Sequence, residues 1–225
     1  GDIQHMTDSI YDQLNASGTI AKQRFVETFS GDALDTDRWS THGSGSHNMS
    51  DSVDGGLALT SPTSGHHQID FAPSDAGKIR QFSPTGAVMI VVSKLQQKQY
   101  SINYSGLRSM YYTEGGTAGY WSVQGQTNGN SGDNKIRLYP NGASNIDTSV
   151  PSSEIHDRHT FKLELTATNT SLSVDGVLSG NGFVSAVGVP TAQCQPYLYS
   201  GTAENPSPVS GGCTTNYTYC EVYNT

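Results

Sequence analysis

The stretch TFKLELTATNTSLSVDG, residues 160–176, decides the fold class because its hydrophobic residues alternate with polar ones. Phe161, Leu163 and Leu165 fall on one side of an extended chain, and polar or charged residues fall on the other. A second, shorter alternation follows and ends at Asp-Gly, residues 175–176, a dipeptide that favours a tight hairpin turn. This stretch predicts two antiparallel strands, each with one buried face.

The chain on either side of this hairpin predicts more short strands separated by Gly, Pro, Asn and Ser clusters. The run AVMIVVS, residues 87–93, is apolar on both faces. It predicts a central strand that is covered on both sides or that places Met89 and Val91 at the floor of a groove. Many short strands indicate an all-β sandwich or barrel in one domain over residues 25–225.

The first 24 residues are predicted to lie outside this domain. Residues 1–5, GDIQH, are interpreted as a cloning remnant. Residues 6–24 carry a broken helical period, which predicts a short N-terminal helix or an extended arm. We expect the arm to pack on a neighbouring subunit and so to organise a homo-oligomer.

Charge and hydropathy exclude several classes of partner. The formal charge of −8 and the pI near 5.2, with no basic patch, argue against nucleic acid, because phosphate binding needs clustered Lys and Arg. The sequence has no long apolar run and no cleavable signal peptide, so we expect no membrane insertion. Three cysteines, Cys194, Cys213 and Cys220, allow one disulfide plus a thiol or only buried thiols, and the sequence does not decide the pairing.

Five segments in order resemble the concanavalin A-like lectin/glucanase superfamily, in particular its laminin-G-like jelly rolls. The opening FVETFSGDALDTDRW is similar to an F-x-G-x-x-L-D-x-x-W strand and turn, and HTFKLELTATNTSLSVDG is similar to a family hairpin. The resemblance implies a jelly-roll sandwich of two antiparallel sheets. The segments are residues 25–39, 53–60, 79–94, 159–178 and 219–225.

The catalytic motifs of this superfamily do not transfer to the sequence. The glucanase branch carries E-x-D-x-x-E on one strand, and none of the six glutamates here begins such a motif. The alginate-lyase branch carries R-x-E-x-R and Q-I-H, and the segment HHQID, residues 66–70, has Asp70 where the imidazole belongs. We therefore expect a non-catalytic module that binds a glycan or a cell-surface polysaccharide. An extracellular or virion-associated attachment protein fits this expectation.

The aromatic stretch SMYYTEGGTAGYWSV, residues 109–123, is the candidate glycan-binding hairpin. Sugars stack their C–H faces on aromatic rings and bind planar polar side chains. The alternative is that period-2 alternation turns about half of the rings into the core. The candidate carbohydrate-binding residues are Arg108, Tyr111, Tyr112, Glu114, Tyr120 and Trp121.

The acidic turn at Asp32, Asp35 and Asp37 has two interpretations. As a turn, Asp35 accepts backbone hydrogen bonds from the residues that follow, while Leu34 and Trp39 pack inward. As a site, the three carboxylates would contribute to a structural calcium cage. The turn is favoured, so we expect no cofactor.

An enzyme is the alternative function, and the sequence leans against it. A divergent glycoside hydrolase would use Glu114, Asp70 or Asp133 as its carboxylates, and a polysaccharide lyase would pair Tyr112 with His67. If their segment is a strand, His66 and His67 point to opposite faces, so only one of them faces a groove.

Overall fold

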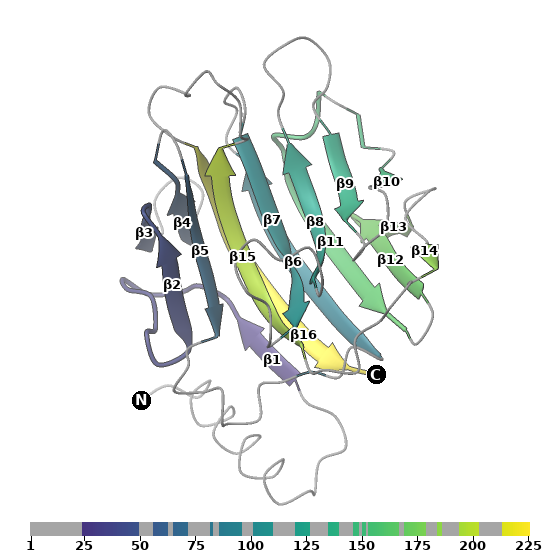
Figure 1. The fold of residues 1–225 in the computed structure, drawn as a ribbon, viewed down its shortest axis with the longest axis horizontal. Coiled ribbons are helices and arrows are strands. Elements are labelled where there is room, and N and C mark those ends of the chain that lie inside the picture. Colours follow the sequence, from purple (N-terminus) through teal and green to yellow (C-terminus); the bar gives the residue numbers. More distant parts are fainter. Residues whose placement is uncertain are drawn as a thin grey trace, which may run out of the picture.

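The computed structural model describes residues 24–49, 56–62, 65–71, 82, 86–95, 101–109, 120–126, 135–139, 146–148, 150–151, 153–166, 169–178, 184–185, 194–202 and 213–225. The described chain is β-structure in two antiparallel sheets (Figure 1). None of these residues forms a helix long and apolar enough to span a membrane. The predicted arm lies outside them, apart from Arg24, which begins β1.

The nine-stranded sheet, here sheet A, has the order β13-β12-β11-β6-β16-β4-β3, with β1 paired to β16 and β14 paired to β12. Its strands are β1 (Arg24–Glu27), β3 (Ser46–Met49), β4 (Leu57–Thr60), β6 (Ala87–Leu95), β11 (Arg158–Leu165), β12 (Asn169–Val174), β13 (Val177–Leu178), β14 (Val184–Ser185) and β16 (Thr214–Asn224).

The seven-stranded sheet, here sheet B, has the order β10-β9-β8-β7-β15-β5-β2 and runs from β2 to β10 across Figure 1. Strands distant in sequence lie side by side in it, because β15 pairs with both β7 and β5. Its strands are β2 (Trp39–Gly43), β5 (His66–Phe71), β7 (Ser101–Ser109), β8 (Tyr120–Gln126), β9 (Lys135–Tyr139), β10 (Ile146–Asp147) and β15 (Cys194–Thr202).

The hairpin predicted from residues 160–176 is confirmed. Phe161 pairs with Val174 and Leu163 with Leu172, and all four side chains are buried. Beyond Val174, Asp175 and Gly176 take positive φ angles of 51° and 81°, as both central residues of a type I′ turn must. The turn returns the chain into β13.

The core fills the space between the sheets. Strand β6 is central as predicted, between β11 and β16, and Met89 and Val91 lie in the core at 1% and 2% exposure rather than at the floor of a groove. In sheet B, alternate residues such as Ile69 and Leu138 join the same core cluster. Period-2 alternation therefore leaves the intervening residues of sheet B on its other face, here called the outer face.

Candidate functional site: the outer face of sheet B

One register row crosses all seven strands of sheet B on the outer face. Each residue of the row pairs directly with the next, and the row spans about 29 Å for six strand spacings of roughly 4.8 Å. Such a length suits an extended chain rather than a compact small molecule. The row is His42, Gln68, Tyr199, Tyr104, Gln124, Arg137 and Asp147.

Tyr199 provides an aromatic platform near the β5 end of this row. Its ring stacks on the His66 ring at 5.3 Å between centroids and 14° between planes. A Cβ at Gly201, two residues further along β15, would lie 2.5 Å from the Tyr199 Oη, so the tyrosine occupies the space that a side chain there would need. Gly201 thus allows Tyr199 to stack on His66.

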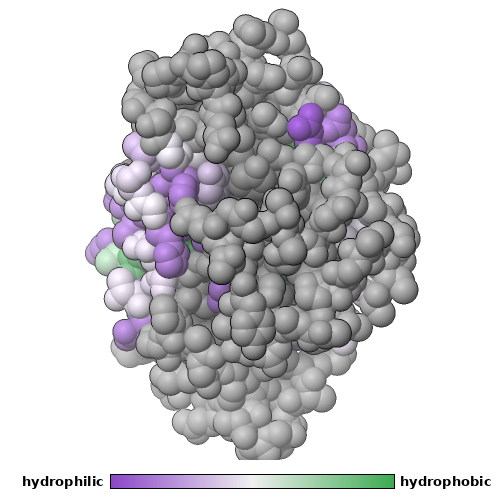
Figure 2. Space-filling model, viewed as in Figure 1, coloured by the Kyte–Doolittle hydropathy of each residue, from purple (hydrophilic) through white to green (hydrophobic). Residues whose placement is uncertain are grey.

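The same face holds buried residues that do not belong to the core cluster. Tyr197 is 6% exposed and Gln195 is 9% exposed, and both share their side of β15 with Tyr199. On the side where β2 and β3 lie in Figure 1, the described surface is mostly hydrophilic (Figure 2). The described residues of the outer face therefore combine the aromatic rings of Tyr197 and Tyr199 with polar groups, which include the Arg137–Asp147 ion pair.

Register places two of the predicted carbohydrate-binding residues together on this face. Arg108 pairs with both Tyr120 and Gln195, in a row parallel to that of Tyr199. Trp121 instead pairs with Leu107, whose side chain is in the core, so the position of Trp121 is on the core side. The other predicted members, Tyr111, Tyr112 and Glu114, lie outside the described residues.

Carboxylates are scarce on sheet B. Strands β7, β8, β9 and β15 contain neither Asp nor Glu, while β5 has Asp70 and β10 has Asp147. These two aspartates are five strand spacings, or about 24 Å, apart. Asp147 is also ion-paired with Arg137 at 2.7 Å. The catalytic candidate Asp133 lies outside the described residues.

His67, the histidine proposed as a catalytic base, lies on the core side of β5. It is 4% exposed and shares its face with buried Ile69, whereas His66 lies on the outer face beside Tyr199. Burial first, and then the neighbouring His47, His66 and His42, lower the pKa of His67. Its position makes His66, rather than His67, the histidine available to a ligand on the outer face.

The acidic turn has the geometry of the turn interpretation. The Asp35 carbonyl accepts from the backbone N–H groups of Arg38 at 3.1 Å and Trp39 at 2.9 Å, and its Oδ1 accepts from the Asp37 N–H at 3.0 Å. Leu34 and Trp39 are buried as expected. In the described part of the chain, which includes Asp32, Asp35 and Asp37, no three His, Cys, Asp or Glu residues could together hold a metal ion.

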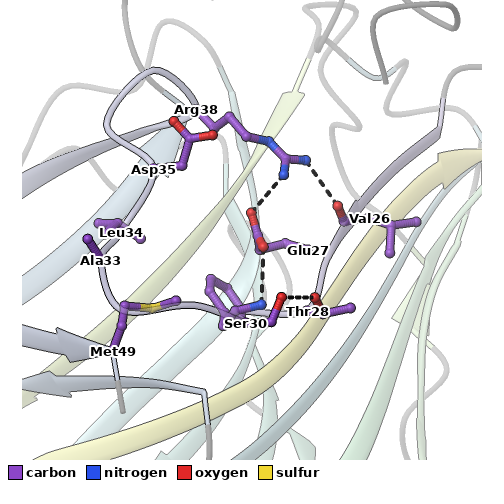
Figure 3. Close-up of a pocket in the computed structure, with 10 residues that line it drawn as sticks. Val26, Glu27, Thr28, Ser30, Ala33, Leu34, Asp35, Arg38 and Met49 are labelled. Carbon is purple, nitrogen blue, oxygen red and sulfur yellow. Dashed lines mark hydrogen bonds and ion pairs between the residues drawn. The ribbon is translucent and has the colours of Figure 1, made fainter. Parts of the chain in front are cut away.

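A buried ion pair beside this turn was not anticipated. Glu27 Oε2 lies 3.0 Å from Arg38 Nη1, at the edge of a cavity of about 290 Å³ (Figure 3). The same carboxylate accepts from the Phe29 N–H at 3.1 Å and from the Trp39 indole N–H at 3.2 Å. The signal was present in the sequence, because Glu27 is two residues from the core residue Phe25 and so takes the same side of β1.

His159 holds the predicted hairpin in place from inside the sandwich. Its Nδ1 lies 2.7 Å from Asp175 Oδ2 and its Nε2 lies 2.8 Å from the Glu154 carbonyl, so both ring nitrogens donate only when the ring is protonated. Burial lowers the pKa of His159, but these hydrogen bonds and the Asp175 charge outweigh it and raise that pKa above 6.5. The role of His159 is structural, because its ring ties Asp175 to Glu154.

Two of the three cysteines are buried thiols. Cys213 and Cys220 are free, and each is 0% exposed. Burial raises the pKa of Cys220 well above its usual value. Of the alternatives left open by the sequence, buried thiols therefore hold for this pair.

No protein-family model and no curated protein matches this sequence. Solved structures do match. A laminarinase from Flavobacterium sp. UMI-01 is 12% identical with a TM-score of 0.65, over 89% of this chain and 99% of that one. An endo-beta-1,3-glucanase from Pyrococcus furiosus is 13% identical with a TM-score of 0.62, over 89% and 93%. The Crh5 transglycosylase is 14% identical with a TM-score of 0.61, over 90% and 84%.

The fold is a concanavalin A-like jelly roll. This confirms the fold that the sequence resemblance implied. Identities this low show the fold alone, and a fold hosts many functions. The side chains of the outer face of sheet B, rather than the fold, therefore bear on the function.

Proposed function

We propose that this chain binds a polysaccharide across the outer face of sheet B without cleaving it. The row from His42 to Asp147 carries the proposal, because it is long and offers rings and planar polar groups in sequence. Aromatic faces and a few planar hydrogen-bonding side chains are the usual means of holding sugars.

The positions of the carboxylates support binding without cleavage. Glycosidases that use a carboxylate pair hold the two groups about 5–9.5 Å apart. Asp70 and Asp147, on β5 and β10, are roughly 24 Å apart, by strand spacing. The described strands of sheet B thus supply no such pair.

The test is binding to soluble polysaccharides by affinity electrophoresis and calorimetry. The probes are laminarin, barley mixed-linkage glucan and mucin glycans, since the solved structures that resemble this chain include proteins named for such glycans. Loss of one stacking ring, about 1.4 kcal/mol, weakens binding about tenfold, which is expected for Tyr199→Ala. Tyr219→Ala is the matched control because Tyr219 lies in sheet A and bonds Glu221. Equal affinity of the parent and Tyr199→Ala for these polysaccharides would exclude the outer face as the binding site.

A glycoside hydrolase is the second candidate, and the comparisons favour it over non-catalytic binding. The solved structures with this fold include a laminarinase, a glucanase and a transglycosylase. The test is release of reducing ends from the same polysaccharides by the parent, and by Glu114→Gln, Asp133→Asn and Asp70→Asn. Turnover by the parent that one of these variants abolishes would replace the binding-only proposal.

A further inference from the structure

Two histidines join the sheets at one edge of the sandwich. His47 belongs to β3 of sheet A, and His67 belongs to β5 of sheet B. His47 Nδ1 lies 3.2 Å from His67 Nε2, and the ring planes differ by only 6°. The centroid separation of 5.4 Å is close to the nitrogen distance plus two ring radii, so the two nitrogens face each other along the line between the rings. This is the geometry of one shared proton.

The surroundings of His67 determine which ring carries that proton. His67 is 4% exposed, and its Nδ1 is buried without a hydrogen-bond partner among the described residues. A buried donor without an acceptor is costly, so Nδ1 must be the unprotonated nitrogen and Nε2–H must donate to His47 Nδ1. The turn between β2 and β3 lies directly against this ring, because a Cβ at Gly45 would be 2.5 Å from the His67 Cβ.

The neighbouring groups disfavour a second proton on the pair. The charges that act on His67 come from His47 on β3, His42 on β2 and His66 on β5, and each of them opposes protonation. On the β15 side the register neighbour is Ser200, which contacts the Cys213 thiol at 3.5 Å and Thr215 at 3.2 Å. Tyr199, also on β15, stacks with His66 rather than with His67.

We propose that the His47–His67 pair is an acid-sensitive latch that holds β3 and the turn 43–46 against β5. A second proton would either place two N–H groups face to face or bury an Nδ1–H that has no acceptor among the described residues. The latched state therefore binds the second proton more weakly than the open state does. The free energy that favours the latched state over the open state is fully present above pH 6.5. It falls as the pH drops from 6.5 toward the lower pKa of the latched His67.

The latch would also affect the outer face, and this step rests on the proposed function. His66 directly precedes His67, lies on the opposite face of β5 and stacks on Tyr199. Because Gly43 packs against His66, release of the turn 43–46 at acid pH would also loosen the two stacked rings of the platform. Glycan binding is expected to weaken over the same pH range in which the latch opens.

The test is hydrogen exchange of the full chain between pH 7.5 and 5, corrected for intrinsic exchange rates. Because opening takes up one proton, protection of residues 40–49 should fall by up to about tenfold per pH unit below 6.5. His67→Gln places an amide N–H where Nε2 donates but cannot titrate, so its protection should not change with pH. His156→Gln is the matched control, because burial also lowers the pKa of His156 and that histidine bonds Leu95 elsewhere.

Long-range proton–nitrogen NMR of the parent at pH 7.5 should show His67 protonated at Nε2 and bare at Nδ1. The opposite tautomer, pH-independent protection in the parent, or the same acid loss in His67→Gln would each overturn the latch. If His67→Gln does not fold, the same exchange experiment on His47→Asn and an NMR titration of the imidazoles in the parent test the latch instead. Failure of glycan binding alone would refute the proposed function and leave these exchange results unaffected.

Discussion

Replacing Glu27 by Ala tests whether the buried ion pair fixes the first turn of the jelly roll. The side chains of Arg38 and Glu27 are 8% and 13% exposed, so solvent screens the pair weakly. The replacement removes three interactions together: the Arg38 ion pair, the Phe29 N–H bond and the Trp39 indole bond. Arg38 keeps its 3.0 Å bond to the Val26 carbonyl and its place 4.7 Å from the Phe25 ring centroid.

The expected loss in free energy of unfolding is about 3–5 kcal/mol, the usual cost of leaving one charge of a buried pair alone. Domains have roughly 5–15 kcal/mol of stability in total, so this one substitution would remove a large share of it. The remaining contacts of Arg38 favour the lower half of the range. Two further donors, the Phe29 and Trp39 N–H groups, also lose their acceptor.

Urea unfolding followed by tryptophan fluorescence measures this loss, since Trp39 bonds Glu27 directly. Glu164→Ala is the matched control, because the Lys162–Glu164 pair is 39% and 36% exposed and should contribute less than about 1 kcal/mol. The double variant Glu27→Leu with Arg38→Met should recover most of the loss, because it removes both charges and keeps the volume. A loss below about 1 kcal/mol in Glu27→Ala, or no recovery in the double variant, would refute this reasoning.

Two further predictions concern the hairpin and the turn after β2. In the parent, stability should fall as the pH rises above 6.5, because the pKa of His159 is raised in the folded state and this depends on Asp175. Asp175→Asn should remove this fall. If urea unfolding between pH 6.5 and 8 gives the same slope of unfolding free energy against pH for the parent and the variant, the prediction is wrong. Gly43→Ala should cost more than about 1 kcal/mol, since φ is 91° and the new Cβ would overlap the His66 carbonyl oxygen. At Gly31, φ is 114° and an added Cβ would meet open space, so Gly31→Ala tests backbone strain without overlap. Thermal unfolding of both variants therefore separates the cost of overlap from the cost of backbone strain.

Some of the outer face was accessible from local pattern. Arg108 and Tyr120 were identified from the aromatic stretch, and the register brings them together. The burial of His67 also had a local signal, because Ile69 is two residues away and apolar, and residues two apart share a face. The aromatic stretch itself did not indicate Tyr199, because β15 is distant from it in sequence and becomes a neighbour of β7 only in the folded sheet.

The sequence by itself determined the two strands of the 160–176 stretch, the Asp175-Gly176 turn and the all-β class, because period-2 alternation and turn chemistry are local properties of the chain. The jelly roll within that class was implied by the resemblance of five segments to a known superfamily. Only the tertiary structure decided that His42, Gln68, Tyr199 and Arg137 share one row, and that Glu27 pairs with Arg38. Strand order and register set these distances. They follow from how two whole sheets bury their apolar faces against each other, which no single segment contains.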